Sequence, residues 1–349
     1  MLPYFTLYFI PAWIAISNAH KRLNHSKIAW FIASLVLILF VGLRTCGGDY
    51  PNYFKRFLIV KQQTFDLAIS SGDIGYKIIT YFVAHNGLPF WVLTLISAAI
   101  SVTGLVKFLQ KQENPWLGLS IAIPYLLIVV YMGYMRQGIA IGLIMWGIAK
   151  LEEDRFLTFI FFAFLAVTFH KTAIIMITYG IFYKESGRFL KTIAILIAGI
   201  GLWYAFVEKE SSGLVTNYVT AHMVSHGALI RVILNAIPAF LLLNYGKFFK
   251  EKYKDYNFWR MIAITSLALI PLVPIASTAV DRMALYFLPL QIVVLTRIPT
   301  LLAGRFAPKL TMSVMVIGFY FIELLVWLSL GNNAFYWLPY TNLMWSDVL

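Results

Sequence analysis

Long runs of apolar residues, separated by short polar stretches, follow one another along almost the whole chain. About 20 apolar residues are what an α-helix needs to cross the ~30 Å hydrocarbon core of a bilayer. Some runs are shorter and must tilt or be shielded by neighbouring helices. The pattern predicts an all-α polytopic membrane protein, a single membrane domain over residues 1–349. Its transmembrane spans number about 12, approximately at 3–19, 28–43, 88–106, 116–133, 137–149, 156–169, 172–183, 192–207, 228–245, 260–279, 283–296 and 310–329.

Three segments outside these runs are long enough to form structure on the outer side: 44–87, 208–227 and the C-terminal tail 330–349. The first contains IGYKIITYFVAH, residues 74–85, which is too short to span and mixes polar with apolar residues. This mixture predicts an amphipathic helix in the membrane interface. The aromatic and amide residues of the tail suit either sugar stacking or an interfacial belt.

The composition agrees with a membrane protein, since 60% of the residues are hydrophobic and 12% are charged, against roughly 25% charged residues in soluble domains. The formal net charge of +13 would suggest nucleic acid in a soluble protein. Most of the lysines and arginines instead fall in alternate short loops, as expected of cytoplasmic loops. We therefore expect no nucleic-acid partner, contact with membrane lipids, and both chain ends on the outer side.

Cysteine and histidine usage argues against a metal centre. The single cysteine, Cys46, excludes an internal disulfide and a cysteine-based metal site. The six histidines are scattered without the spacing of a metal-binding motif. We expect neither a bound metal nor another cofactor.

Arg136 is the only charge in the apolar tract from Trp116 to Ala149, in the sequence YMGYMRQGIAIGL. As one helix this tract would extend roughly 51 Å, too long for a single crossing. It therefore predicts a tight hairpin with its turn at Met135–Gly138. Arg136 then lies near the outer interface at a helix start, where its guanidinium and the free backbone amides form an anion site. The alternative is an arginine that extends towards lipid headgroups.

The segment GLRTCGGDYPNYFKRF, 42–57, carries polar residues at the outer end of a predicted span. Its paired glycines permit a tight turn, and Arg44, Asp49 and Tyr53 surround that turn. An ordinary external loop with an Arg–Asp pair is the alternative.

Two more polar motifs fall on the same predicted side. AVTFHKTAIIM places His170 at a turn, where an imidazole can act as a general base near neutral pH or serve only as an interfacial polar residue. STAVDRMALYF places Asp281 and Arg282 inside an apolar stretch, where they can pair with each other or bind an anion. Each motif alone is a weak signal, but hairpin turns would bring all of them to one outer cavity.

The motifs GLRTCGGDYPNY, MRQGIAIGL, FHKTAIIM and DRMALYF, in this order, resemble those of the EpsG family of bacterial polysaccharide polymerases. These are relatives of the Wzy-type polymerases of O-antigen and capsule synthesis. The resemblance covers most of the chain and implies a GT-C-like membrane glycosyltransferase of the bacterial inner membrane that needs no metal. Its donor and acceptor would be undecaprenyl-pyrophosphate-linked oligosaccharides on the periplasmic side. A flippase and a chain-length regulator would be its functional partners.

The resemblance also implies roles for the motif residues. Negative charge develops on the leaving pyrophosphate, and arginines can meet it with bidentate bonds: Arg44, Arg136 and Arg282. The acceptor hydroxyl needs a base, for which His170 is preferred over Asp49 because Arg44 can engage Asp49. Three further polar residues would complete the substrate site: Tyr53, Gln137 and Asp281.

Two other functions remain open. An O-antigen ligase uses the same donor but usually has a larger periplasmic loop than the segment 208–227. A flippase or transporter of lipid-linked sugars would place charges along a path through several spans, whereas the candidate charges here gather at the outer ends. We therefore expect a polymerase of lipid-linked glycan repeats.

Overall fold

The computed structural model describes residues 1–17, 20–70, 72–183, 193 and 227–344, and the predicted outer segment 208–227 lies outside them except for Gly227. The described residues form helices and contain no β-strand. Three of these helices, 90–109, 256–285 and 309–330, are long and apolar enough to cross a membrane, and one bent pair makes a fourth. The predicted all-α membrane class is thus supported, while about 12 spans and a GT-C-like architecture stay predictions.

The helices have the following bounds in chain order. They are α1 (Leu2–Ile16), α2 (His20–Leu23), α3 (Lys27–Gly42), α4 (Tyr50–Val60), α5 (Phe65–Ile69), α6 (Ile74–His85), α7 (Phe90–Leu109), α8 (Pro115–Ala122), α9 (Met135–Glu152), α10 (Phe156–Phe169), α11 (Ile175–Tyr179), α14 (Ala228–Asn244), α15 (Gly246–Lys252), α16 (Tyr256–Ala268), α17 (Val273–Leu285), α18 (Leu288–Leu301) and α19 (Lys309–Leu330). A π-helix, η1 (Ile123–Tyr131), continues α8, and the short 3₁₀ segments are η2 (Lys171–Ile174), η3 (Gly180–Phe182), η7 (Ile270–Leu272) and η8 (Ala334–Tyr336).

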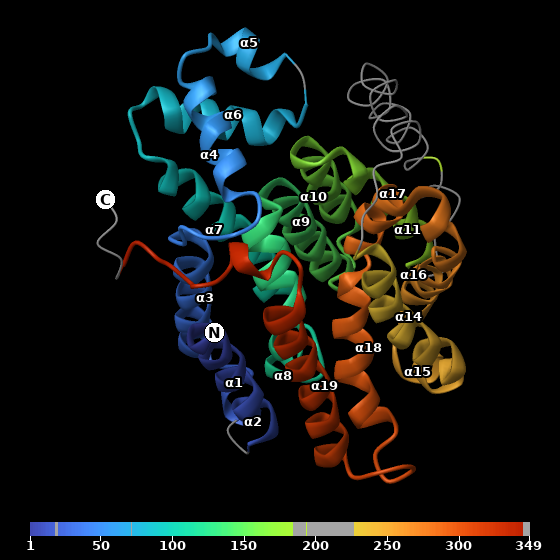
Figure 1. The fold of residues 1–349 in the computed structure, drawn as a ribbon. Helices are drawn as coiled ribbons and strands as arrows, with labels where there is room; N and C mark the ends of the chain where they lie inside the picture. The colour runs from blue at the N-terminus through green and yellow to red at the C-terminus, as the bar shows by residue number, and fades with distance from the viewer. Residues whose placement is uncertain (18–19, 71, 184–192, 194–226, 345–349) are drawn as a thin grey trace.

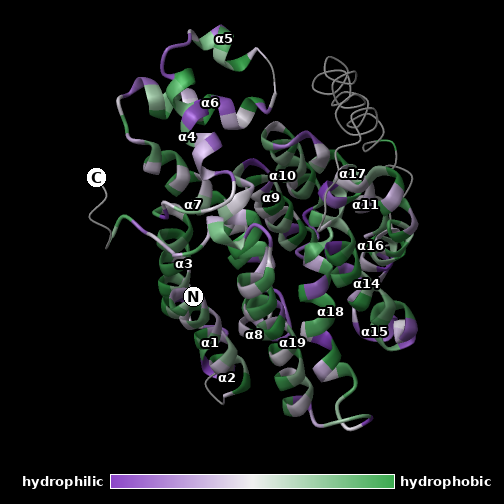
Figure 2. Cartoon of the chain, viewed as in Figure 1, coloured by the Kyte–Doolittle hydropathy of each residue, from purple (hydrophilic) through white to green (hydrophobic). Residues whose placement is uncertain are grey.

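The apolar helices pack into one bundle, and α4, α5 and α6 stand over one end of it (Figure 1). Helix α9 packs between α7 and α10 near the middle of the bundle. Figure 2 shows hydrophobic residues over most of the bundle, and many large apolar side chains point outwards from it, among them Trp13, Phe31, Met315 and Ile322. Outward-facing apolar side chains of this kind are expected where a bundle contacts lipid. We call α4–α6, residues 50–85, the cap.

The hairpin expected between Trp116 and Ala149 is present. The chain runs through α8 and η1, breaks at Tyr134, and continues from Met135 as α9, which packs against η1. The break lies directly before Met135–Gly138, which the sequence places near the turn. Arg136 sits in the first turn of α9, as the length of the tract required.

The C-terminal tail lies at the same end of the bundle as the cap (Figure 1). The Trp337 indole donates a 2.8 Å hydrogen bond to the Ile128 carbonyl in η1. Its ring lies so close to Gly48 and Gly133 that a Cβ at these glycines would meet it at 2.8 and 2.9 Å. Trp337 and Tyr340 are both buried. These two tail aromatics are therefore core residues, which neither interpretation of the tail anticipated.

Among the described basic segments, α2, α15 and the α18–α19 connection lie away from the cap, towards the other end of the bundle (Figure 1); the predicted basic loop around 184–191 lies outside the described residues. Three ion pairs join residues of the predicted basic loops: Lys252–Glu113 at 2.9 Å, Lys111–Glu153 at 2.8 Å and Arg297–Asp255 at 2.7 Å. The ion pairs thus join basic segments that the charge pattern assigns to one side. Which side of the membrane each end faces stays a prediction.

Candidate active site

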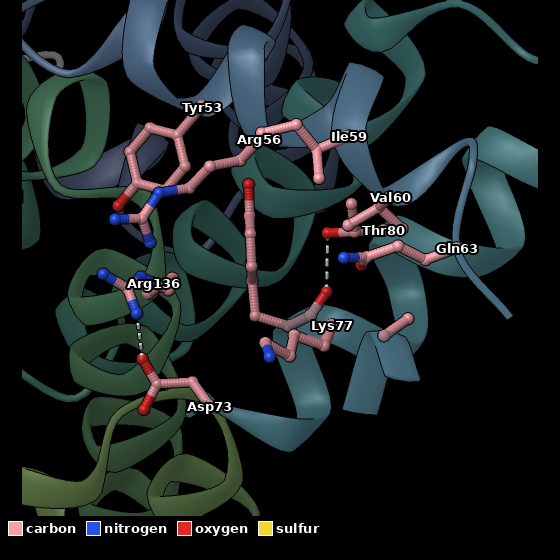
Figure 3. A pocket seen from close by; sticks show the side chains of 11 residues that line it. Tyr53, Arg56, Ile59, Val60, Gln63, Asp73, Lys77, Thr80 and Arg136 are labelled. Atoms are coloured by element: carbon pink, nitrogen blue, oxygen red, sulfur yellow. Dashed lines mark hydrogen bonds and ion pairs between the residues drawn. The ribbon is translucent and has the colours of Figure 1, made fainter. Parts of the chain in front are cut away.

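Two adjoining pockets lie between the cap and the start of α9. The first, about 380 Å³, has mixed lining with several charged side chains, and we call it the polar pocket; it is lined by Asp49, Asn52, Tyr53, Lys55, Arg56, Ile59 and Arg136. The second, about 230 Å³, is mostly apolar, and we call it the apolar pocket (Figure 3); it is lined by Tyr53, Arg56, Ile59, Val60, Gln63, Ala68, Asp73, Tyr76, Lys77, Thr80 and Arg136. Four residues belong to both pockets: Tyr53, Arg56, Ile59 and Arg136.

The sequence before α4 explains how the cap presents its side chains. Gly47 has φ +123°, a left-handed conformation that favours glycine, and it turns the chain from α3 into α4. Along α4 the buried residues Tyr53, Phe57 and Val60 recur at helical spacing. This stripe forms the buried face of α4, and Arg56 lies at the exposed rim of the polar pocket.

Arg136 forms the wall between the two pockets. Its Nη1 donates a 2.6 Å hydrogen bond to Oδ2 of Asp73, the residue immediately before α6. Its Nε is buried and has no hydrogen-bond acceptor among the described residues. Figure 3 shows the guanidinium groups of Arg56 and Arg136 pointing towards the same space beside Tyr53. Two cations converging with spare donors form a site for an anion.

His170 lies on the other side of Asp73. The residue ends α10 and is buried, and its Nδ1 is 3.6 Å from the same Asp73 Oδ2. Neither ring nitrogen has a hydrogen-bond partner in the described part of the chain. Burial lowers the pKa of His170, and the negative charge of Asp73 offsets this only in part. The imidazole is therefore neutral at pH 7 and able to accept a proton.

Asp73 is ionised next to it. Burial alone would raise the pKa of the Asp73 carboxyl, but His170 and the positive charges of Arg136 and Lys171 bring that pKa below its usual value. Asp73 is therefore a carboxylate at any pH where the protein works. The result is a buried cluster in which one carboxylate links an arginine and a neutral imidazole.

Arg282 and Gln137 approach the cluster from α17 and α9. The Gln137 amide donates a 2.9 Å hydrogen bond to the Arg282 backbone carbonyl. The charge of Arg282 contributes to the low pKa of His170, which places that arginine near the imidazole. Asp281, next in the chain, forms an ion pair with Arg231, with 2.6 Å between Nη2 and Oδ2. Arg231 was not among the predicted partners of Asp281.

Arg44 is placed differently from the other predicted arginines. It is buried, with 1% of its surface exposed, and it lines neither pocket. Its guanidinium donates to the backbone carbonyls of Val41 and Met132, with 3.1 Å between Nε and the Met132 oxygen. These bonds tie the end of α3 to the turn before α9. Arg44 thus shapes the framework behind the pockets, and its expected engagement with Asp49 is replaced by carbonyl partners.

The predicted residues therefore divide into groups. Asp49, Tyr53 and Arg136 line the polar pocket, while His170 reaches the site through Asp73. Asp73 and Tyr76 are absent from the residues predicted from sequence. Tyr76 lines the apolar pocket, and its buried hydroxyl has no hydrogen-bond partner within the described ranges of the chain. The available signal was the position of Asp73 directly before the predicted helix 74–85.

The described residues contain no group of three or more His, Cys, Asp or Glu side chains that is able to hold a metal ion. Glu323 is an isolated carboxylate in α19, and both its oxygens are buried without a partner among the described residues. It lies outside both pockets. The charged and titratable groups described at the site are the arginines, the Asp73 carboxylate that pairs with Arg136, and the His170 imidazole.

Fold and site together define an all-α membrane protein with a polar and an apolar pocket that share Arg136. The chain matches the EpsG family over residues 27–342 and belongs to it, and this family is associated with Wzy-type polymerases. The match includes the cap, α9, His170 and Arg282. No significant similarity to a curated protein or to a solved structure was found. The family and the apolar helices together identify a membrane protein of polysaccharide biosynthesis.

Proposed function

We propose that the protein is a glycosyltransferase that polymerises undecaprenyl-pyrophosphate-linked oligosaccharide repeats into O-antigen, capsule or exopolysaccharide. It acts in the bacterial inner membrane, with the pockets facing the periplasm. One observation carries the proposal: Arg136, whose buried Nε has no partner among the described residues, lines both a polar pocket and an apolar one. A lipid-linked glycan has the same three parts, namely sugar, pyrophosphate and hydrocarbon.

The pyrophosphate is assigned to the wall between the pockets. A buried donor without a partner costs about 1–3 kcal/mol, and a phosphate oxygen at Arg136 Nε removes that cost. Arg56 faces the same space (Figure 3), and Lys77 lines the apolar pocket nearby. These cations stabilise the charge that develops on the leaving pyrophosphate, which is work that divalent ions do in other transferases. We therefore propose a reaction that needs no metal.

The two pockets receive the two ends of the donor. Ile59, Val60 and Ala68 give the apolar pocket a surface for the first part of the lipid chain. The outer surface of the cap also carries exposed Phe54, Leu58 and Leu67, which suit contact with the bilayer interface. Asp49, Asn52 and Lys55 give the polar pocket the donors and acceptors that a sugar requires.

His170 is the proposed base, and Asp49 is the alternative on the polar-pocket side. The acceptor hydroxyl oxygen attacks the anomeric carbon of the donor while the bond from that carbon to the pyrophosphate oxygen breaks. His170 accepts the hydroxyl proton, and the lipid pyrophosphate leaves as an anion held by Arg136. Neutral, buried His170 suits this role because its low pKa keeps it unprotonated at pH 7.

The proposal is tested in cells that make the polymer. We expect Arg136→Ala, expressed at the normal level, to abolish polymer longer than one repeat while lipid-linked single repeats persist. Arg305→Ala is the matched control, because Arg305 is exposed in the α18–α19 connection, far from the cap (Figure 1). A normal polymer length distribution in Arg136→Ala would remove the proposed pyrophosphate role.

A further inference from the structure

A single carboxylate oxygen of Asp73 faces two partners. Its Oδ2 is 2.6 Å from Arg136 Nη1 and 3.6 Å from His170 Nδ1. The first distance is a charge-assisted hydrogen bond, whereas the second exceeds hydrogen-bond range. The carboxylate therefore binds Arg136 closely and makes only a longer contact with the imidazole.

His170 is left incomplete by this arrangement. Both of its ring nitrogens are buried without a partner among the described residues. The hydrogen bond made by one ring nitrogen decides which nitrogen carries the proton and which is basic. Among the described residues, no hydrogen bond of ordinary length fixes the tautomer of His170. An imidazole without a fixed tautomer is a poor general base, since proton transfer needs a defined geometry.

A pyrophosphate bound through the Nε of Arg136 would share the guanidinium with Asp73, which is bonded to Nη1. Its oxygens offer more negative charge than one carboxylate. Two anions on one guanidinium repel each other, and this repulsion weakens the bond between Asp73 and Nη1. Closing on His170 requires Oδ2 to move by less than about 1 Å to reach ordinary hydrogen-bond length.

We propose that Asp73 exchanges partners when the donor binds. The pyrophosphate takes Arg136, and Asp73 turns to His170, accepts a hydrogen bond from Nδ1–H, and leaves Nε2 as the basic nitrogen. Asp73 is thus a positioning residue for the base, and the base is completed only when the donor pyrophosphate is in place. The inference rests on the proposed function, because it takes His170 as the base and Arg136 as the pyrophosphate ligand.

The charged groups around His170 set the sign of the effect. Arg136 and Arg282 disfavour the imidazolium, whereas Asp73 favours it. Lys171, adjacent in the chain, acts on Asp73 in the same direction as Arg136. Pyrophosphate binding therefore raises the pKa of His170 by two routes: its own charge, and the approach of Asp73. Asp73→Asn removes only the second route.

The first test measures binding and turnover of Asp73→Asn, with inorganic pyrophosphate as the binding probe. Because Asp73 competes with pyrophosphate for Arg136, we expect the variant to bind pyrophosphate several-fold more tightly. We expect its kcat with lipid-linked repeats to fall at least about 10-fold, since the base is no longer positioned. Asp66→Asn, at an exposed position in α5, is the control and should change neither value. Weaker pyrophosphate binding together with lost turnover would show a structural role and overturn the proposal.

The second test observes His170 directly by NMR of the full-length protein with isotope-labelled histidine, which gives only six signals to assign. Adding pyrophosphate should convert His170 of the wild type to the Nδ1–H tautomer. In Asp73→Asn, pyrophosphate should bind without fixing the tautomer. An Nδ1–H tautomer already fixed before pyrophosphate is added, or the same response in both proteins, would overturn the partner exchange while leaving the proposed function intact. If the wild type does not bind pyrophosphate by calorimetry, the proposed function itself fails.

Discussion

Replacing Arg136 with lysine isolates the contribution of its guanidinium fork. Lysine keeps a positive charge near Asp73, but it removes the buried Nε donor, which has no partner in the part of the chain that the structure describes. A hydrogen bond to a charged group contributes about 1.5–3 kcal/mol. Losing one such bond to the departing pyrophosphate should lower kcat/KM about 10- to 150-fold.

Arg56→Lys is the matched comparison. Arg56 lines the same two pockets but is exposed on the outside of α4. Exposed charges are screened by water and contribute about 0–1 kcal/mol, so its replacement should lower kcat/KM by no more than about 5-fold. The difference between the two variants measures the effect of burial at the wall.

The assay is the initial rate of glycan transfer by each purified variant from a defined lipid-linked repeat, with folding checked by its elution profile and thermal unfolding. If Arg136→Lys keeps the wild-type kcat/KM, or if Arg56→Lys is the more damaging change, the leaving group does not depart from Arg136. Equal losses in both variants would show that the pockets attract the donor by overall charge alone.

Three further predictions concern pH, the apolar pocket and the framework. Because burial lowers the pKa of His170, the midpoint of the acidic limb of the kcat/KM–pH profile should lie below the ordinary histidine value of about 6.5. In Asp73→Asn the midpoint should move to still lower pH, because the variant loses the charge that favours the imidazolium. A midpoint above about 6.5 would exclude His170 as the base. Gln63→Trp, which narrows the apolar pocket, should raise KM for the lipid-linked donor without changing the affinity for inorganic pyrophosphate, and an equal effect on both ligands would show that the lipid binds elsewhere. Trp337→Ala should lower the free energy of unfolding by about 3–5 kcal/mol. Trp337→Phe should lower it by about 1 kcal/mol, because it loses the hydrogen bond to Ile128. Thermal unfolding in detergent measures both changes, and a Trp337→Ala variant as stable as the wild type would contradict the core position of the tail.

The features that depend on local pattern and length could be predicted from the sequence. The apolar tract around Arg136 is too long for one crossing, and this alone places the arginine near a turn at the start of a helix. The residues 74–85 do form a helix, α6, because their apolar positions recur at helical spacing. The sidedness of the basic loops stays a prediction.

The pairings between distant residues could not be predicted in this way. Arg136 pairs with Asp73, which lies 63 positions away in the chain. Asp281 pairs with Arg231, which lies 50 positions away. The local pattern of one segment does not indicate which residue of the other segment it contacts. Arg44 is the converse case: the sequence suggests a charge that can bind an anion, but its guanidinium donates to two backbone carbonyls. Trp337 has the composition of an interfacial aromatic, but two glycines at separate turns make room for it in the core.

The cap explains why the site residues are spread over so much of the chain. The cap supplies Tyr53 and Arg56 from α4, Asp73 directly before α6, and Tyr76 within α6. The bundle supplies Arg136, His170 and Arg282. The apolar stripe of α4 fixes the cap on the bundle, and the paired glycines before α4 allow the required turn. The site therefore exists only where the cap meets the bundle.

The most direct test of the central claim is the product ladder formed by the purified protein from one defined undecaprenyl-pyrophosphate-linked repeat, without added metal. We predict products that grow by one repeat at a time, absent with Arg136→Ala and unchanged with Arg305→Ala. A single transfer to an unrelated lipid acceptor would indicate a ligase. Movement of the lipid-linked repeat across the membrane without a new glycosidic bond would indicate a flippase, and either result would contradict the proposed polymerase.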